Sequence, residues 1–337
     1  MDYGMKLICN VLIALMAIAM GCSSTSFEKM VEPDPPPLGY GKTYTLQNES
    51  VKVVVAPEIG RVIHFGFVGE RNLVWMKDRG DLAKDKASGA EWLNWGGDKV
   101  WPAQQAKWPL IYGGGDWPPK TKLDGYAFRV VESTAAKLVI ESPVDQALHV
   151  RLRRTFCLDD DLPRLTIENT LTREASSSWP VHIWSVTQCV LPNYTLLGIA
   201  EDAPKRDSQP FLNLWDAPLP DSNAKLMTNA LRLSLDENLS IAKAGTIGSW
   251  CAAVYDNEIF LQKSDAPPNG RYPDGANVEV FMFDQYTELE LLSSSVHLPK
   301  GKSISSATVW SLLKTEAKAT TEENLKLIEG LNSAEGL

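Results

Sequence analysis

Polar and apolar side chains alternate with a period of two along most of the chain after residue 50. This alternation, with β-branched and aromatic residues at apolar positions, predicts strands that bury one face. The predicted strands cover residues 51–56, 61–68, 126–133, 137–142, 148–158, 164–172, 180–191, 231–235, 250–255, 259–263, 278–283, 286–293 and 305–313. Turn sequences such as Asp159-Asp160-Asp161 separate them. We therefore expect an all-β fold of large antiparallel sheets packed face to face.

One segment near the C-terminus has the spacing of a helix. Leu325, Ile328 and Leu331 form an apolar stripe within residues 320–331, which predicts a short amphipathic helix. Two long stretches, 78–123 and 192–226, lack a regular period, and loops of this length are usually functional or shaped by packing. We expect a single domain over residues 38–315, followed by a C-terminal helix and tail over 316–337.

The N-terminus has the composition of an export signal. Lys6 precedes an apolar run over residues 7–20, and Gly21-Cys22 follows it, which predicts a secretory signal peptide over residues 1–22. A small residue before a cysteine resembles a bacterial lipobox, so we expect lipidation at Cys22, with a plain signal peptide as the alternative. Residues 23–37 are rich in Ser and Pro and predict an extended tether. The predicted location is the bacterial cell envelope, as an exported lipoprotein of the outer membrane or one that faces the periplasm.

Charge and cysteine spacing exclude several classes of function. The formal net charge of −9 over 337 residues argues against a nucleic-acid partner, which would require clustered basic residues. The body keeps only Cys157, Cys189 and Cys251, at spacings that fit no metal motif, so we expect no metal and favour buried thiols over a disulfide. No nucleotide-binding glycine loop or nucleophile elbow is present, and we expect no cofactor.

Tryptophan is concentrated in one segment. Residues 92–119 hold five of the eleven tryptophans of the chain, interspersed with glycines and with Asp98, Lys99 and Asp116. A flat apolar ring with one N–H donor suits the C–H face of a pyranose, and nearby carboxylates bind hydroxyls. The alternative is that the rings pack in the core. We expect Trp95, Asp98 and Trp101 near a sugar, with Trp108 and Trp117 packed beneath it.

Two predicted strands carry groups capable of acid–base chemistry. Glu288 and Glu290 project from one strand face, about 7 Å apart by the strand rise. Such a pair suits acid–base work if one carboxyl is desolvated, although an exposed acidic face is the commoner explanation. On another strand His182, Trp184 and Gln188 share a face. A histidine is a natural proton donor near neutral pH, but a lone histidine on a strand is often structural.

Four segments resemble a known bacterial family. They are NWGGDKVWPAQ at 94–104, WSVTQ at 184–188, YPDG at 272–275 and YTELELLS at 286–293. In this order they resemble the family named domain of unknown function 4380, over residues 51–313. That family is similar to galactose-mutarotase-like proteins, which implies a β-supersandwich. It does not itself imply an activity.

The mutarotase resemblance implies roles for three residues. In sugar mutarotases a glutamate on a late strand removes the proton of the anomeric hydroxyl, a histidine protonates the ring oxygen, and the ring opens and recloses. By motif, Glu290 takes the base role and His182 the acid role, although the histidine motif of those enzymes is absent here. Arg61 resembles an early arginine that binds sugar hydroxyls.

These patterns give a ranked set of hypotheses. The first is a lipid-anchored protein of mutarotase-like fold that binds a mono- or oligosaccharide. The second is an aldose 1-epimerase that uses Glu290 and His182. The third is a polysaccharide hydrolase or lyase, with Glu288 or Asp98 paired to Glu290, and the fourth is a structural envelope protein. The predicted sugar-binding residues are Arg61, Trp95, Asp98, Lys99, Trp101, Trp184, Gln188, Asp274 and Glu288.

Overall fold

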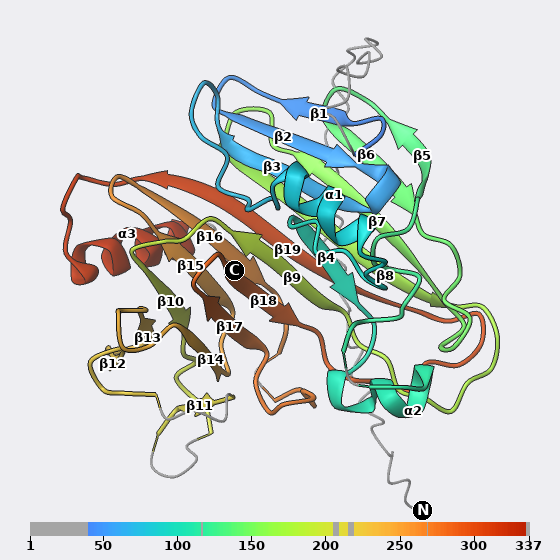
Figure 1. Ribbon diagram of the computed structural model, residues 1–337. Coiled ribbons are helices and arrows are strands. Elements are labelled where there is room, and N and C mark those ends of the chain that lie inside the picture. The colour runs from blue at the N-terminus through green and yellow to red at the C-terminus, as the bar shows by residue number, and fades with distance from the viewer. Residues whose placement is uncertain (1–39, 116, 205–208, 215–218, 268, 335–337) are drawn as a thin grey trace, which may run out of the picture.

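Two antiparallel sheets make up most of the structure (Figure 1), a computed structural model that describes residues 40–115, 117–204, 209–214, 219–267 and 269–334. The predicted all-β class, with large antiparallel sheets and a short C-terminal helix, is confirmed. The signal peptide, Cys22 and the tether fall on residues outside the described part of the chain. None of the helices in the described residues is long and apolar enough to span a bilayer.

The first sheet has nine strands in the described chain. In spatial order they are β1 (Tyr44–Gln47), β2 (Val51–Ala56), β3 (Arg61–Phe67), β4 (Asp98–Trp101), β9 (Trp184–Cys189), β18 (Thr287–Leu292), β17 (Val278–Phe283), β14 (Ile241–Thr246) and β11 (Phe211–Asn213). Strands distant in sequence are therefore neighbours: β4 and β18 both pair with β9.

The second sheet has ten strands in the same described residues. Their order is β12 (Ala224–Leu226), β13 (Ala230–Leu233), β10 (Tyr194–Gly198), β15 (Trp250–Val254), β16 (Glu258–Ser264), β19 (Ser303–Lys314), β8 (Arg164–Arg173), β7 (Val150–Leu158), β6 (Lys137–Glu141) and β5 (Arg129–Ser133). The helical segments are η1 (Pro57–Ile59), α1 (Arg79–Ala87), η2 (Gln105–Lys107), α2 (Trp108–Tyr112) and α3 (Thr321–Ala334).

The main core lies between the two sheets. Phe65 of β3 reaches across to Phe260 and Trp310 of the second sheet, with ring centroids 5.0 and 5.3 Å away. From β18, Leu289 and Leu291 enter the same apolar cluster. Because side chains alternate along a strand, Glu288 and Glu290 point to the outer face of the first sheet. Burial of the leucines of β18 in the core therefore places its glutamates on the outer face.

The C-terminal helix α3 forms where its apolar stripe predicts. Thr320 Oγ1 accepts a hydrogen bond from the Glu323 N–H at 3.2 Å, and Glu323 Oε2 accepts one from the Thr320 N–H at 2.7 Å. This reciprocal arrangement is a capping box, which satisfies donors at the helix start. Leu325 and Ile328 pack on the outer side of the second sheet. In Figure 1 α3 lies at the end of the molecule far from α2.

The two stretches without a regular period contain structure that periodicity did not predict. Residues 78–123 hold α1, β4 and α2, and residues 192–226 hold β10, β11 and β12. Helix α1 buries only Leu82, so it has no apolar stripe, and its start is stabilised by Asp78, whose side chain accepts hydrogen bonds from the N–H groups of Gly80 and Asp81. Strand β4 buries two charged residues, which breaks the expected alternation.

Candidate functional site

Strand pairing in the first sheet gathers charged residues on its outer face. Glu279 of β17 lies opposite Glu290 of β18, and Lys243 of β14 lies opposite Phe281, two residues beyond Glu279. Directly opposed residues in an antiparallel pair project from the same face. We call this region, with Lys99, Lys243, Glu279, Glu288 and Glu290, the carboxylate face.

Lys243 bridges the two buried carboxyl groups. Its Nζ lies 2.9 Å from Glu279 Oε2 and 3.0 Å from Glu290 Oε2. Both glutamates are fully buried, and the lysine side chain is 15% exposed. Burial of a charge is costly unless it is paired. Lys243 therefore makes it possible for both carboxyl groups to sit beneath the surface.

Burial changes the protonation of this group. It raises the pKa of Glu290 to about 8; Lys243 acts against this increase, while Glu279 and Glu288 add to it. Burial likewise raises the pKa of Glu279, and Lys243 acts against this increase. Near neutral pH Glu290 is therefore mostly protonated, and Lys243 remains charged because the two carboxyl groups outweigh the effect of its burial and raise its pKa.

A second ion pair lies beside the first. Lys99 Nζ of β4 is 3.0 Å from Glu288 Oε1, and Gln188 Nε2 of β9 donates to the same oxygen at 2.9 Å. Glu288 lies opposite Gln188 in the sheet, and its side chain is 11% exposed. Solvent thus reaches the carboxylate face at Glu288 and at Lys243.

Aromatic rings border the exposed part of this face. Phe281 lies opposite Glu288 and Lys243, and the ring of Tyr286 is 6.4 Å from that of Phe281 and 4.6 Å from that of Trp75. All three rings are partly exposed. The Tyr286 side chain hydrogen-bonds to Asn94 and Gln188. Flat rings beside carboxylates, amides and ammonium groups form the chemical setting that a sugar ring requires.

Trp184 connects the tryptophan segment to Glu290. Its indole N–H donates to Glu290 Oε2 at 2.7 Å, and its ring lies 4.9 Å from that of Trp101 in an edge-to-face contact. His182 also stacks on the Trp184 ring, with centroids 6.4 Å apart. His182 is fully buried, and desolvation lowers its pKa to about 3, so it is neutral at physiological pH. Trp184 thus contacts both His182 and Glu290.

Arg61 lies under the tryptophan segment in a closed ion pair. Its guanidinium contacts Asp124 and the carbonyl of Gly96, and Asp124 also accepts the indole N–H groups of Trp92 and Trp101 at 3.0 and 2.9 Å. Burial alone would raise the pKa of Asp124, but Arg61, Lys99 and the two indoles lower it. These contacts fix the conformation of the loop and occupy the guanidinium of Arg61.

Asp98 lies on the other face of the sheet from Glu290. Its carboxylate pairs with Arg154 of β7 in the second sheet and accepts the Thr187 hydroxyl at 3.0 Å. Arg154 also donates to Asn169 at 2.9 Å. Asp98 therefore links the two sheets in the core. The first sheet lies between its carboxylate and the carboxyl group of Glu290.

The remaining predicted residues are spread along the edges of this region. Trp95 packs with Tyr40, at 6.0 Å between centroids, in a separate small cluster. Asp274 is exposed, accepts a hydrogen bond from Gln104 at 3.0 Å, and acts on the pKa of Glu279. Trp108 is buried, whereas Trp117 is 48% exposed, with its ring 4.9 Å from that of Trp92. The structure thus gathers the Glu290, Glu288, Lys99, Trp101, Trp184 and Gln188 side chains.

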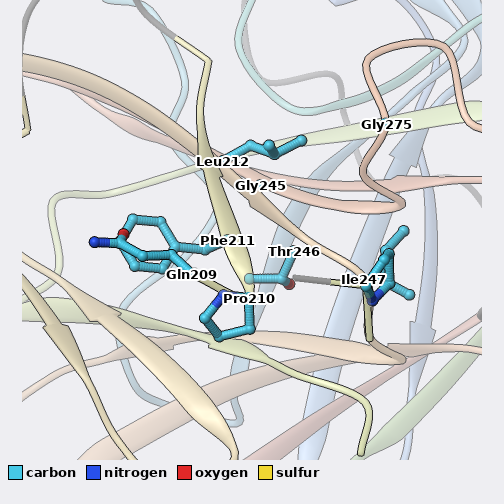
Figure 2. A pocket seen from close by; sticks show the side chains of 9 residues that line it. Gln209, Pro210, Phe211, Leu212, Gly245, Thr246, Ile247 and Gly275 are labelled. Carbon is cyan, nitrogen blue, oxygen red and sulfur yellow. The ribbon is translucent and has the colours of Figure 1, made fainter. Parts of the chain in front are cut away.

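A hollow opens at the β11 edge of the carboxylate face. Its lining includes Leu212 of β11, Gly245 of β14 and Gly275 (Figure 2). Gly245 lies opposite Glu279, and a Cβ at this glycine would approach Ala276 to 2.6 Å and Glu279 Cγ to 3.4 Å. Because residue 245 has no side chain, the 272–277 turn can pack against this strand and Glu279. This contact lies next to the hollow.

The sequence over residues 42–313 matches the family described as Domain of unknown function (DUF4380). The chain belongs to this family. Among curated proteins, no sequence matches the chain.

Solved structures place this DUF4380 member among mutarotase-like folds. A galactose mutarotase-like protein from Lactobacillus casei ATCC 334 is 12% identical, with a TM-score of 0.53 over 80% of this chain and 100% of the other. A galactose mutarotase related enzyme from Lactobacillus acidophilus is 12% identical, with a TM-score of 0.52 over 82% and 100%. The Slr1438 protein from Synechocystis sp. PCC 6803 is 12% identical, with a TM-score of 0.52 over 87% of this chain and 99% of the other. At such identities the likeness shows the fold alone.

Sequence reasoning missed five residues of the site in this DUF4380 protein. They are Glu279, Lys243, which bridges the glutamates, and the bordering rings of Trp75, Phe281 and Tyr286. Lys243 is a lone charge within the small and apolar run Ile241–Thr246, which was a usable signal. Glu279 was visible on its strand, but only the pairing of β17 with β18 brings it to Glu290.

Proposed function

We propose that this protein is a lipoprotein of the bacterial cell envelope that binds a mono- or oligosaccharide on the carboxylate face. The observation that carries the proposal is the placement of Lys243 and Glu288, at the solvent edge, beside the partly exposed rings of Phe281 and Tyr286. Carboxylates and ammonium groups bind sugar hydroxyls, and a flat ring covers the apolar face of a pyranose.

The names of the structural neighbours support a sugar as the ligand. Two of them are named as galactose mutarotase-like or galactose mutarotase related. Glu290 of this chain lies on a late strand of the sheet and has the environment of an acid–base group, since it is desolvated and held by a lysine and an indole. If this chain acts on sugars as the names of these neighbours suggest, the carboxylate face is where the sugar would bind.

Calorimetric titration of the purified full-length chain with neutral mono- and oligosaccharides tests the proposal. We expect binding by at least one sugar, and a loss of about tenfold or more in affinity for Glu290→Gln, because the carboxyl group orients Trp184 and Lys243. Glu258→Gln is the matched control: Glu258 is also buried, but it belongs to β16 of the second sheet and pairs with Arg71. Binding by no sugar, with the fold intact by circular dichroism, would refute the proposal.

The envelope location rests on the lipobox-like Gly21-Cys22 after the apolar run. Labelling of expressing bacteria with a fatty-acid analogue tests it. We expect the label on the wild-type chain and on Cys157→Ser, and none on Cys22→Ser. A labelled Cys22→Ser chain would contradict the anchor.

A second candidate function is aldose 1-epimerisation, favoured by the pKa of Glu290 at about 8, which suits a group that exchanges protons near neutral pH. Glu290 would remove the proton of the anomeric hydroxyl. The titratable carboxyl beside it is that of Glu279, whereas His182 is buried, stacked on Trp184 and neutral. Polarimetry of fresh glucose and galactose would show faster mutarotation than buffer, lost in Glu290→Gln and kept in Glu258→Gln. A wild-type rate equal to that of buffer excludes this candidate.

A further inference from the structure

We infer that the site selects uncharged sugars over sugar acids, and that Glu279 is the residue that determines this selection. The inference rests on the proposed carbohydrate binding and specifies its ligand class. Sugar acids here means monosaccharides that carry a carboxylate, such as uronic acids.

The cations of the carboxylate face are already engaged by protein carboxylates. Lys99 is held by Glu288 at 3.0 Å, and Lys243 is held between Glu279 and Glu290. Arg61, under the adjoining loop, is paired with Asp124. A sugar carboxylate would have to displace one of these internal partners, which would leave a buried carboxylate unpaired and cost more than the new contact returns.

Carboxylates also outnumber ammonium groups on the described part of this face. Asp274 adds a fourth carboxylate to Glu279, Glu288 and Glu290, and its charge acts on Glu279. Even with Glu290 protonated near neutral pH, the carboxylates of Glu279, Glu288 and Asp274 outnumber the ammonium groups of Lys99 and Lys243. An anionic sugar would enter a region of the same sign, in surroundings where water screens the repulsion weakly.

A neutral sugar also supplies the hydrogen-bond donor that Glu279 lacks. Its Oε1 is buried and has no hydrogen-bond partner among the residues that the structure describes. The Glu279 side chain lies next to Gly245 through its Cγ, and Gly245 borders the hollow of Figure 2. A buried acceptor without a donor is unfavourable until a donor reaches it. A sugar hydroxyl is such a donor, whereas an ionised sugar carboxylate can only accept.

Calorimetric titration with matched sugar pairs tests the inference on the full-length chain near neutral pH. The pairs are glucose with glucuronate and galactose with galacturonate. For the pair that binds, we expect the neutral sugar to bind at least about tenfold more tightly than its acid. Glu279→Gln removes the charge and keeps a carbonyl acceptor, so this ratio should fall about tenfold. Glu258→Gln, buried in the other sheet, should leave the ratio unchanged.

Each outcome of this titration is decisive. If Glu279→Gln does not fold, Asp274→Asn replaces it, since Asp274 is exposed, and the ratio should fall about threefold. Equal or tighter binding of the sugar acid by the wild-type chain overturns the selectivity but leaves carbohydrate binding standing. Binding of neither member of any pair, nor of other neutral sugars, refutes the proposed function, and the selectivity fails with it.

Discussion

Glu279 and Glu290 lie directly opposite each other on adjacent strands, and one ammonium group, that of Lys243, contacts an oxygen of each. Two like charges at this separation in a buried site cannot both persist without such a partner. The proton that Glu290 keeps near neutral pH and the cation between the two carboxyl groups make the unit nearly neutral. The stability of the sheet and the chemistry of its outer face therefore depend on the same three residues.

Replacement of Lys243 by methionine should destabilise the fold. The two buried carboxyl groups would lose their cation, and breaking a buried pair in this way costs about 3–5 kcal/mol. Urea unfolding followed by tryptophan fluorescence measures the change. Lys314→Met is the control: Lys314 pairs with Glu70 at 2.5 Å, but both side chains are more than 40% exposed, so we expect a cost below about 1 kcal/mol. Equal effects of the two variants would contradict the role given to Lys243.

The stability of the protein should fall with rising pH because of Glu290. Its pKa is raised from 4.5 to about 8 on folding, chiefly by burial. A carboxyl group with a raised pKa binds its proton more readily in the folded state, so its contribution is complete below the unfolded pKa and declines as pH rises through the folded one. Between about pH 5 and pH 8, the free energy of unfolding of the wild type should fall relative to that of Glu290→Gln. Parallel curves for the two proteins would refute the shift.

Asp98→Asn should separate stability from binding. The substitution leaves the buried guanidinium of Arg154 without its carboxylate, and we expect a loss of about 3–5 kcal/mol in the free energy of unfolding. Because Asp98 projects into the core, the sugar affinity of the folded variant should match that of the wild type. A folded Asp98→Asn protein with weakened sugar binding would show that Asp98 contributes to the site.

His182 should remain neutral under mildly acidic conditions. Desolvation lowers its pKa from 6.5 to about 3, so its imidazole should not titrate above about pH 5. Nitrogen-detected NMR of labelled histidine, assigned with His182→Gln, follows the ring directly. Because the unfolded chain takes up a proton on this histidine below about pH 6.5, His182 contributes stability above that pH and loses it as the pH falls. A His182 midpoint near 6.5 would contradict the buried, neutral ring.

The sequence predicts most of the sheets because β-branched and aromatic runs mark the strands. The alternation is clean in β7 and β8, which bury one face, whereas β9, β15 and β18 are buried on both faces. Strand β2 matches its predicted residues 51–56, and α3 is only a few residues longer than its stripe. Strand β4 escaped detection because Asp98 and Lys99 are charged at consecutive positions and each is neutralised on a different face. Such partners come from strands far away in sequence, and a periodicity of two does not reveal them.

The candidate site was predictable only in its individual residues. Glu288, Glu290, Trp184 and Gln188 share a face because the strand period fixes their directions. That Lys243 and Glu279 complete the group follows from the order of β9, β18, β17 and β14, which depends on long-range pairing. The local sequence pattern also does not predict which tryptophans are exposed: Trp117 is half exposed, whereas Trp108, nine residues earlier, is buried.

A crystal structure of the full-length protein soaked with galactose or glucose tests the central claim most directly. The account predicts a sugar on the carboxylate face, with its hydroxyls within hydrogen-bond distance of Lys243 and Glu288 and its apolar face against Phe281 or Tyr286. A sugar bound only elsewhere, for example against the exposed ring of Trp117, would contradict it.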